Sequence, residues 1–110
     1  MRSRARVAGA GAIAMSLVLA SCARRPPPRA YTVTIVNFVS QPATLRVAPG
    51  DTVVWKNTDF VPHTATARDG AFDSKTIDGG KSWRWVAAAA GSHPYYCIFH
   101  PNMQATIEVR

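Results

Sequence analysis

The chain has 110 residues, which is enough for one domain with a single hydrophobic core. Its formal net charge of +7 suggests an acidic partner, but six of the 13 basic residues fall within the first 29 positions. From residue 31 onward seven basic and six acidic residues nearly balance, and no Lys/Arg cluster is interleaved with aromatic residues. We therefore expect no nucleic acid among the partners of the folded part.

The first 21 residues have the composition of an export signal. A basic start precedes an uncharged apolar run over 7–20, which is too short for a comfortable transmembrane helix. The run ends in LASC, residues 19–22, which resembles the bacterial lipobox, whose cysteine is acylated. We expect a lipoprotein-type signal peptide over 1–21 and a lipid on Cys22. The protein would then be exported, periplasmic or at the cell surface, and anchored to the membrane.

Two other interpretations of Cys22 stay open. Ordinary cleavage nearby would leave Cys22 free or remove it, and a Cys22–Cys97 disulfide is possible in an exported protein. Residues 22–30 are expected to form a linker, because three consecutive prolines favour extended polyproline II.

Residues 31–110 have the pattern of a β domain. Alternating apolar and polar runs, separated by turns rich in Pro, Gly and Asp, are spaced as in sandwiches and barrels. We expect an all-β, Greek-key β-sandwich of about seven or eight strands, with 68–80 irregular because that stretch is rich in turn residues. The predicted strands cover 31–38, 43–47, 51–57, 63–67, 81–86, 92–97 and 104–110.

The stretch YYCIFHPNM, residues 95–103, spaces a cysteine, a histidine and a methionine at intervals of three. A tight loop bent at Pro101 can turn Cys97, His100 and Met103 toward one point. Thiolate, imidazole and thioether together suit copper in a trigonal site of two histidines and one cysteine, with a weak axial methionine. Such a site needs a second histidine.

His63 is the better of the two remaining histidines. It lies between Pro62 and a predicted strand, and in a Greek-key sandwich a residue so far upstream can share an end with the last loop. His93 is on the same predicted strand as Cys97, roughly 13 Å further along. We interpret His93 as a partly exposed strand or turn residue.

The segments PGDTVVWKNTDFVPHTAT and GSHPYYCIFHPNMQATIEV resemble the cupredoxin family of small blue copper proteins. The resemblance covers about 31–110, and the Cys-x-x-His-x-x-Met spacing is closest to that of amicyanin- and plastocyanin-like members. It implies one type 1 copper ion as cofactor, bound by His63, Cys97, His100 and Met103.

The resemblance also implies a mononuclear electron-transfer protein that exchanges electrons with unidentified redox partner proteins. We expect the protein to be a monomer. The edge of the His100 ring would be the electron port. An apolar patch would surround it, formed by Phe60, Pro62, Phe99 and Pro101.

Other functions are less compatible with the residues. Copper enzymes of this fold need further histidines, such as a His-Cys-His run, whereas positions 96 and 98 are Tyr and Ile. We therefore expect no enzymatic activity. Structural zinc would need a fourth strong ligand. A copper-delivery protein with similar ligands stays the main alternative, followed by a metal-free adhesion sandwich.

Two neighbours of the ligands carry further expectations. Many cupredoxins have proline where this chain has Phe99, so the Phe99 N–H could donate to the Cys97 sulfur and raise the reduction potential. Several relatives have Asn where this chain has Thr64. Bracing between the loops at that position is uncertain from sequence, and Asn57 or Thr58 could contribute it instead.

Overall fold

The computed structural model describes residues 1, 3, 5, 8–16 and 25–110. Cys22 and the expected cleavage point before it lie outside these residues. Within the described part, no helix has the length and apolar character needed to cross a membrane.

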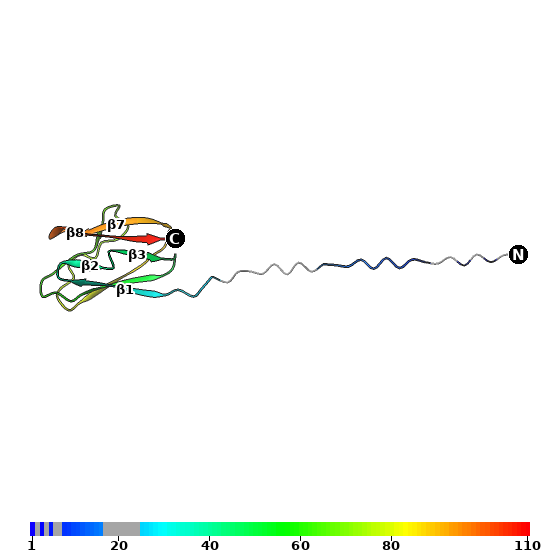
Figure 1. Cartoon of the computed structure of the whole chain (residues 1–110), viewed down its shortest axis with the longest axis horizontal. Coiled ribbons are helices and arrows are strands. Elements are labelled where there is room, and N and C mark those ends of the chain that lie inside the picture. The colour runs from blue at the N-terminus through cyan, green and yellow to red at the C-terminus, as the bar shows by residue number, and fades with distance from the viewer. Residues whose placement is uncertain (2, 4, 6–7, 17–24) are drawn as a thin grey trace.

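In the described part of the chain, eight strands form two four-stranded sheets that face each other (Figure 1). One sheet has the order β2-β1-β4-β6 and the other β3-β8-β7-β5. The pairs β1–β4 and β3–β8 are parallel, so the chain crosses between the sheets instead of forming hairpins throughout. The expected all-β sandwich is confirmed. Its strands are β1 (Ala30–Val36), β2 (Val39–Gln41), β3 (Thr44–Val47), β4 (Thr52–Asn57), β5 (Thr66–Ala67), β6 (Ser82–Val86), β7 (Gly91–Cys97) and β8 (His100–Val109).

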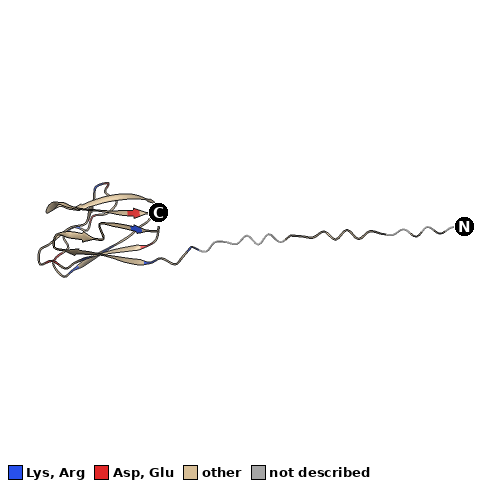
Figure 2. Ribbon diagram, viewed as in Figure 1, with Lys and Arg blue, Asp and Glu red and all other residues tan. Residues whose placement is uncertain are grey.

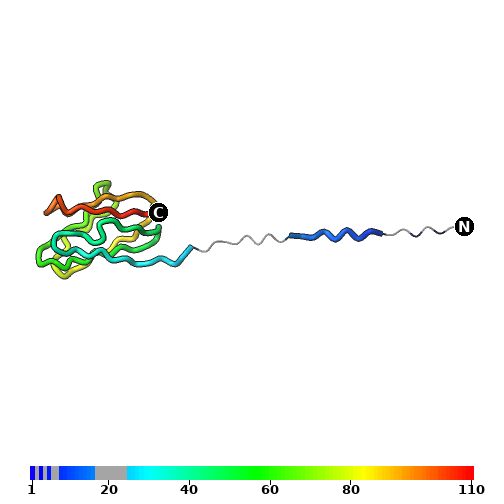
Figure 3. The backbone as a smooth tube through the Cα atoms, viewed as in Figure 1, coloured from blue at the N-terminus to red at the C-terminus, as the bar shows by residue number. Residues whose placement is uncertain are grey.

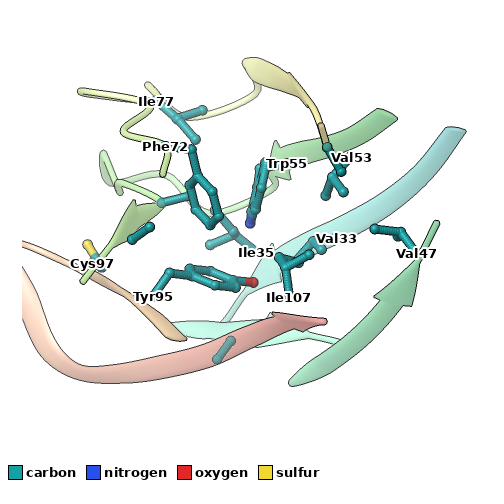
Figure 4. Close-up of a cluster of buried hydrophobic side chains, with 14 of the residues drawn as sticks. Val33, Ile35, Val47, Val53, Trp55, Phe72, Ile77, Tyr95, Cys97 and Ile107 are labelled. Carbon is teal, nitrogen blue, oxygen red and sulfur yellow. The ribbon is translucent and has the colours of Figure 1, made fainter. Parts of the chain in front are cut away.

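The core lies between the sheets and is centred on Trp55 (Figure 4). This fully buried ring lies 5.0 Å from Phe72, 5.5 Å from Trp83 and 5.6 Å from Tyr95, measured between ring centroids. Burying each large aromatic side chain stabilises the fold by roughly 1.5–3 kcal/mol. The alternation of β6 and β8 explains which side chains face the core: Ala105, Ile107 and Val109 are buried, and Trp83 and Trp85 pack against the cluster.

The strand boundaries differ from expectation in three places. The short strand β2 was not predicted, because three residues carry too little alternation. Strand β8 begins at His100, so His100 and Met103 belong to a strand and not to a loop. The stretch 68–80 contains only isolated β-bridges, as expected, yet its Phe72 and Ile77 are core residues.

The two ends of the sandwich have different roles. The linker enters β1 at the end where the C-terminus lies, and the turn between β7 and β8 lies at the opposite end (Figure 3). We call the second end the β7–β8 end.

Asp51 fastens the linker end. Its carboxylate accepts hydrogen bonds from the backbone N–H groups of Arg29, at 2.8 Å, and of Ala48, at 2.8 Å. These two bonds hold the pKa of the Asp51 carboxyl below its ordinary value of 3.8.

Asp51→Asn should therefore lower the stability of the domain near neutral pH. A carboxyl whose folded pKa is depressed stabilises the fold above its unfolded pKa, and this contribution is lost as pH falls through the folded pKa. The stability gap between wild type and Asp51→Asn, measured by urea denaturation, should be constant above about pH 5 and shrink below the ordinary pKa of 3.8. A gap that stays the same size down to pH 2 would contradict this explanation.

Candidate metal centre

His63 is held by backbone pairing after the end of β4. Its N–H donates to the carbonyl of Ile77 at 3.1 Å, and the Ile77 N–H donates back at 2.8 Å. The Asn57 side-chain amide donates to the carbonyls of Val61 and Ile77, which braces the same segment. His63 is fully buried as a result. The Asn57 bonds brace the His63 segment against the 77–80 turn.

Gly79 allows this segment to pack closely against the 77–80 turn. A Cβ atom on Gly79 would lie 2.6 Å from the carbonyl oxygen of Asp59 and 3.2 Å from that of Phe60. Since both atoms belong to the backbone, no side-chain movement could relieve the clash.

Cys97 and His100 face each other across a two-residue turn. They form the last pair of the β7–β8 ladder, and the register shifts between Tyr96 and Cys97. Because Tyr96 pairs with Gln104, residues 101–103 form a bulge beside Cys97. Met103 ends that bulge and is buried in the same core cluster as Cys97.

The structure brings three of the four predicted donors together. His63 Nδ1 lies 3.7 Å from the Cys97 Sγ atom, and His100 Nδ1 lies 3.8 Å from it. All three donor atoms lie within 4.8 Å of one another. Cys97 is a free, buried cysteine among the described residues. The Cys22–Cys97 disulfide that the sequence left open involves Cys22, which lies outside the described residues.

These distances fit a trigonal metal ion. With bond lengths like those of zinc, about 2.0 Å to nitrogen and about 2.3 Å to sulfur, an angle of roughly 120° separates the two donors by roughly 3.7 Å. One thiolate and two imidazoles are the donors that a copper electron-transfer site uses. The donor set therefore fits copper.

Thr64 joins the two segments that carry the donors. Its N–H donates to Cys97 Sγ at 3.3 Å, and its hydroxyl oxygen accepts from the Ile98 N–H at 3.0 Å. The bracing that was uncertain at Thr64 is therefore present. The hydrogen bond expected from the Phe99 N–H to the sulfur is not among those that Cys97 makes in the described chain. That expectation was wrong, and the Thr64 amide takes the role.

Asp59 fixes which nitrogen of His63 faces the sulfur. Its Oδ2 atom lies 2.7 Å from His63 Nε2, so a proton on Nε2 would be donated to this carboxylate, and Nδ1 is the nitrogen that faces the Cys97 sulfur. Partial burial raises the pKa of Asp59, but hydrogen bonds from Phe38, His63 and Asn37 outweigh it and leave that pKa below its ordinary value.

His93 lies outside the donor cluster, as expected. Its ring is partly exposed on β7, and its Nδ1 lies 2.6 Å from a carboxylate oxygen of Asp69. The sequence did not identify Asp59 as the partner of His63, or Phe38 as the aromatic residue that contacts the rings of His63 and His100. Asp59 is four residues before His63, the one signal that could have identified it.

The comparisons with known proteins define the class. The Cupredoxin-like domain model matches residues 9–109, so the chain belongs to this family. Its cofactor is accordingly one type 1 copper ion, in agreement with the donor set.

Within this class the chain is similar to amicyanins. It is 26% identical over 118 residues to amicyanin-alpha of Methylorubrum extorquens, covering 99% of each chain. It is 27% identical over 85 residues to amicyanin of Paracoccus denitrificans, covering 73% of this chain and 65% of that protein.

Solved amicyanin structures have the same fold. The Cu(I) form of a methionine-to-alanine variant matches with a TM-score of 0.70 at 26% identity, covering 74% of this chain and 82% of that chain. A reduced proline-to-phenylalanine variant matches with a TM-score of 0.69 at 27% identity and the same coverage.

Thr64→Val should destabilise the metal-free protein by about 1–3 kcal/mol, because it leaves the Ile98 N–H without its acceptor. Thr64→Ser keeps the hydroxyl and is the matched control. Urea denaturation of the metal-free protein measures both. Equal stabilities of the two variants would show that the hydroxyl does not hold the segments together.

Proposed function

We propose that this protein is a blue copper electron carrier whose ligands are His63, Cys97, His100 and Met103. The observation that supports this most is the convergence of two imidazoles on one thiol at the spacing of a trigonal ion. Copper, when bound, supplies a one-electron couple between its cuprous and cupric states.

Each ligand has a distinct role in this proposal. The Cys97 thiolate would be the strong, electron-delocalising ligand, and the two histidines would be the other strong ligands. The Met103 thioether would be the weak fourth ligand that helps to set the potential. Its place in the bulge beside Cys97 supports this assignment.

The scaffold suits a reaction without rearrangement. His63, Cys97 and Met103 are buried. Cys97 is the last residue of β7 and His100 is the first residue of β8, and the two residues are paired. A close-packed surrounding of this kind resists movement of the donors. A site that keeps one geometry in both copper valences needs little reorganisation, which favours electron transfer over copper release.

The β7–β8 end is the proposed docking face for redox partner proteins. His100 is the one partly exposed member of the donor cluster. Phe38 contacts the His100 ring and is half exposed, and Ile98 and Phe99 form the exposed apolar turn that precedes it. Val39 follows Phe38, Phe60 and Val61 precede His63, and all three are exposed as well. The β7–β8 turn itself carries no charged residue, as Figure 2 shows. An apolar face with an uncharged turn beside His100 suits brief docking that depends little on salt.

The proposal includes export and an anchored location. A signal peptide over 1–21, a lipid on Cys22 and a linker over 22–30 would hold the domain by the end opposite the docking face. Arg25, Arg29 and Arg110 line a cavity of about 540 Å³ at that end, which supports its orientation toward an anionic membrane surface. The β7–β8 end would then point away from the membrane.

Adding Cu(II) to the purified protein tests the function. An electron carrier should give an intense blue thiolate-to-copper absorption that bleaches with a reductant and returns on reoxidation. Weak colour with ready loss to a chelator would favour copper delivery. No colour at all would favour a metal-free sandwich.

His63→Asn and His93→Asn make a matched pair for the ligand assignment. His63→Asn should abolish the blue absorption, because one of three strong ligands is lost. His93→Asn should leave it unchanged, because that ring pairs with Asp69 outside the donor cluster. Loss of the colour in the His93 variant alone would overturn the assignment.

Phe60→Asp tests the docking face through electron self-exchange between two copies, measured by NMR line broadening. Like charges meeting across an interface cost several kcal/mol, so the exchange rate should fall by at least about tenfold. Val86→Asp adds the same charge at an exposed apolar position paired with Thr52, near the linker end, and should have little effect. Equal slowing by both variants would point to net charge instead of the docking face.

A further inference from the structure

The turn between β1 and β2 has an unusual backbone. Val36 pairs with Val39, so Asn37 and Phe38 are the two central residues of a hairpin turn. Their φ angles are +51° and +60°, the left-handed combination of a type I′ turn. Asparagine is common there, but a bulky aromatic residue is an outlier that persists only where its surroundings enforce it.

Asp59 supplies that enforcement from another segment. Its Oδ1 atom accepts from the Asn37 N–H at 2.7 Å, and its Oδ2 atom accepts from the Phe38 N–H at 3.0 Å. The same Oδ2 atom lies 2.7 Å from His63 Nε2. One carboxylate therefore receives the two turn amides and the buried imidazole together.

The turn held in this way places the Phe38 ring against both histidines. Its centroid lies 5.2 Å from that of His63 and 4.7 Å from that of His100, with interplanar angles of 89° and 87°. Both are edge-to-face contacts of the favourable kind. The two imidazole centroids lie 5.2 Å apart, so Phe38 contacts a pair of neighbouring rings.

We propose that Asp59 and Phe38 form a clamp that fixes the two histidine rings before metal binds. Asp59 is the positioning residue, because it orients His63 directly and holds the turn that carries Phe38. Phe38 then restrains the ring of His100, which is partly exposed at the start of β8. This inference rests on the proposed function for its copper consequences, but the clamp itself is a property of the metal-free protein.

The charge of Asp59 has a second consequence. A carboxylate on the far nitrogen of a ligand imidazole strengthens its other nitrogen as a donor. A stronger nitrogen donor favours Cu(II) over Cu(I), because the higher charge gains more from it. The clamp should therefore lower the reduction potential as well as fix the ring.

Asp59→Asn is the central test, with Asp69→Asn as its matched control. In Asp59→Asn the side-chain amide has one acceptor oxygen for the N–H groups of Asn37, Phe38 and His63. Asp69→Asn makes the same change in the carboxylate that contacts His93, which lies outside the donor cluster. In the metal-free protein, ¹⁵N NMR should show a slowly exchanging His63 Nε2 proton in wild type and in Asp69→Asn. The proton should exchange rapidly in Asp59→Asn.

Copper binding gives the second measurement. Loss of such a partner typically weakens metal affinity by about 10- to 100-fold. We expect Asp59→Asn to weaken Cu(II) binding by that factor, to weaken Cu(I) binding less, and so to raise the potential. Asp69→Asn should change neither. An unchanged His63 proton together with an unchanged potential would overturn the clamp.

Phe38→Ala separates the ring contact from the hydrogen bonds and decides the case if Asp59→Asn does not fold. It should leave the His63 Nε2 proton protected but introduce conformational exchange at the His100 ring, detected by relaxation dispersion in the metal-free protein. A His100 ring as static as in wild type would contradict the restraint. If wild type binds no copper while these NMR effects appear, the proposed function fails and the clamp stands.

Discussion

The candidate centre depends on two hydrogen bonds that Thr64 makes across the end of the sandwich. One is to the sulfur of Cys97 and the other is from the Ile98 N–H, and each spans more than thirty positions in sequence. They join the segment that carries His63 to the hairpin that carries Cys97 and His100. Together with the pairing of Thr66 in β5 with Tyr96 in β7, this junction keeps the donors of the two segments beside each other.

The hydrophobic core holds the two sheets together next to this junction. Trp55 and Tyr95 come from opposite sheets and their rings meet edge to face, so the strands that end in the two ligand segments cannot slide independently. Close packing of this kind keeps the sheets in fixed relation. The stored strain lies at the surface, where Phe38 in the left-handed region costs about 1–3 kcal/mol. In our proposal this strain belongs to the function, since it places the ring that restrains the histidines.

Much of the fold and all three grouped donors could be predicted from sequence. Strict alternation in β8 and the spacing of Cys97, His100 and Met103 are local patterns, which the sequence shows directly. His63 was the better of the two remaining histidines, because it lies between a proline and a predicted strand. Phe72 and Ile77 are core residues inside an irregular stretch without periodicity, so no pattern marked them. Thr64 and Phe38 act through contacts between distant segments, as does Asp59 toward the β1–β2 turn, and such contacts follow from the tertiary structure alone. Only the spacing of Asp59 and His63 is local. The expectation for the Phe99 N–H failed for the same reason, because the amide that donates to the Cys97 sulfur is that of Thr64, 33 positions away in sequence.

The ligand assignment is tested most directly by a crystal structure of the copper-loaded protein with anomalous diffraction at the copper edge. We expect one copper ion bound by Nδ1 of His63, Nδ1 of His100 and the Cys97 sulfur, with the Met103 sulfur as a more distant fourth ligand. A copper ion bound at His93 and Asp69, or at a site that excludes the Cys97 sulfur, would contradict it.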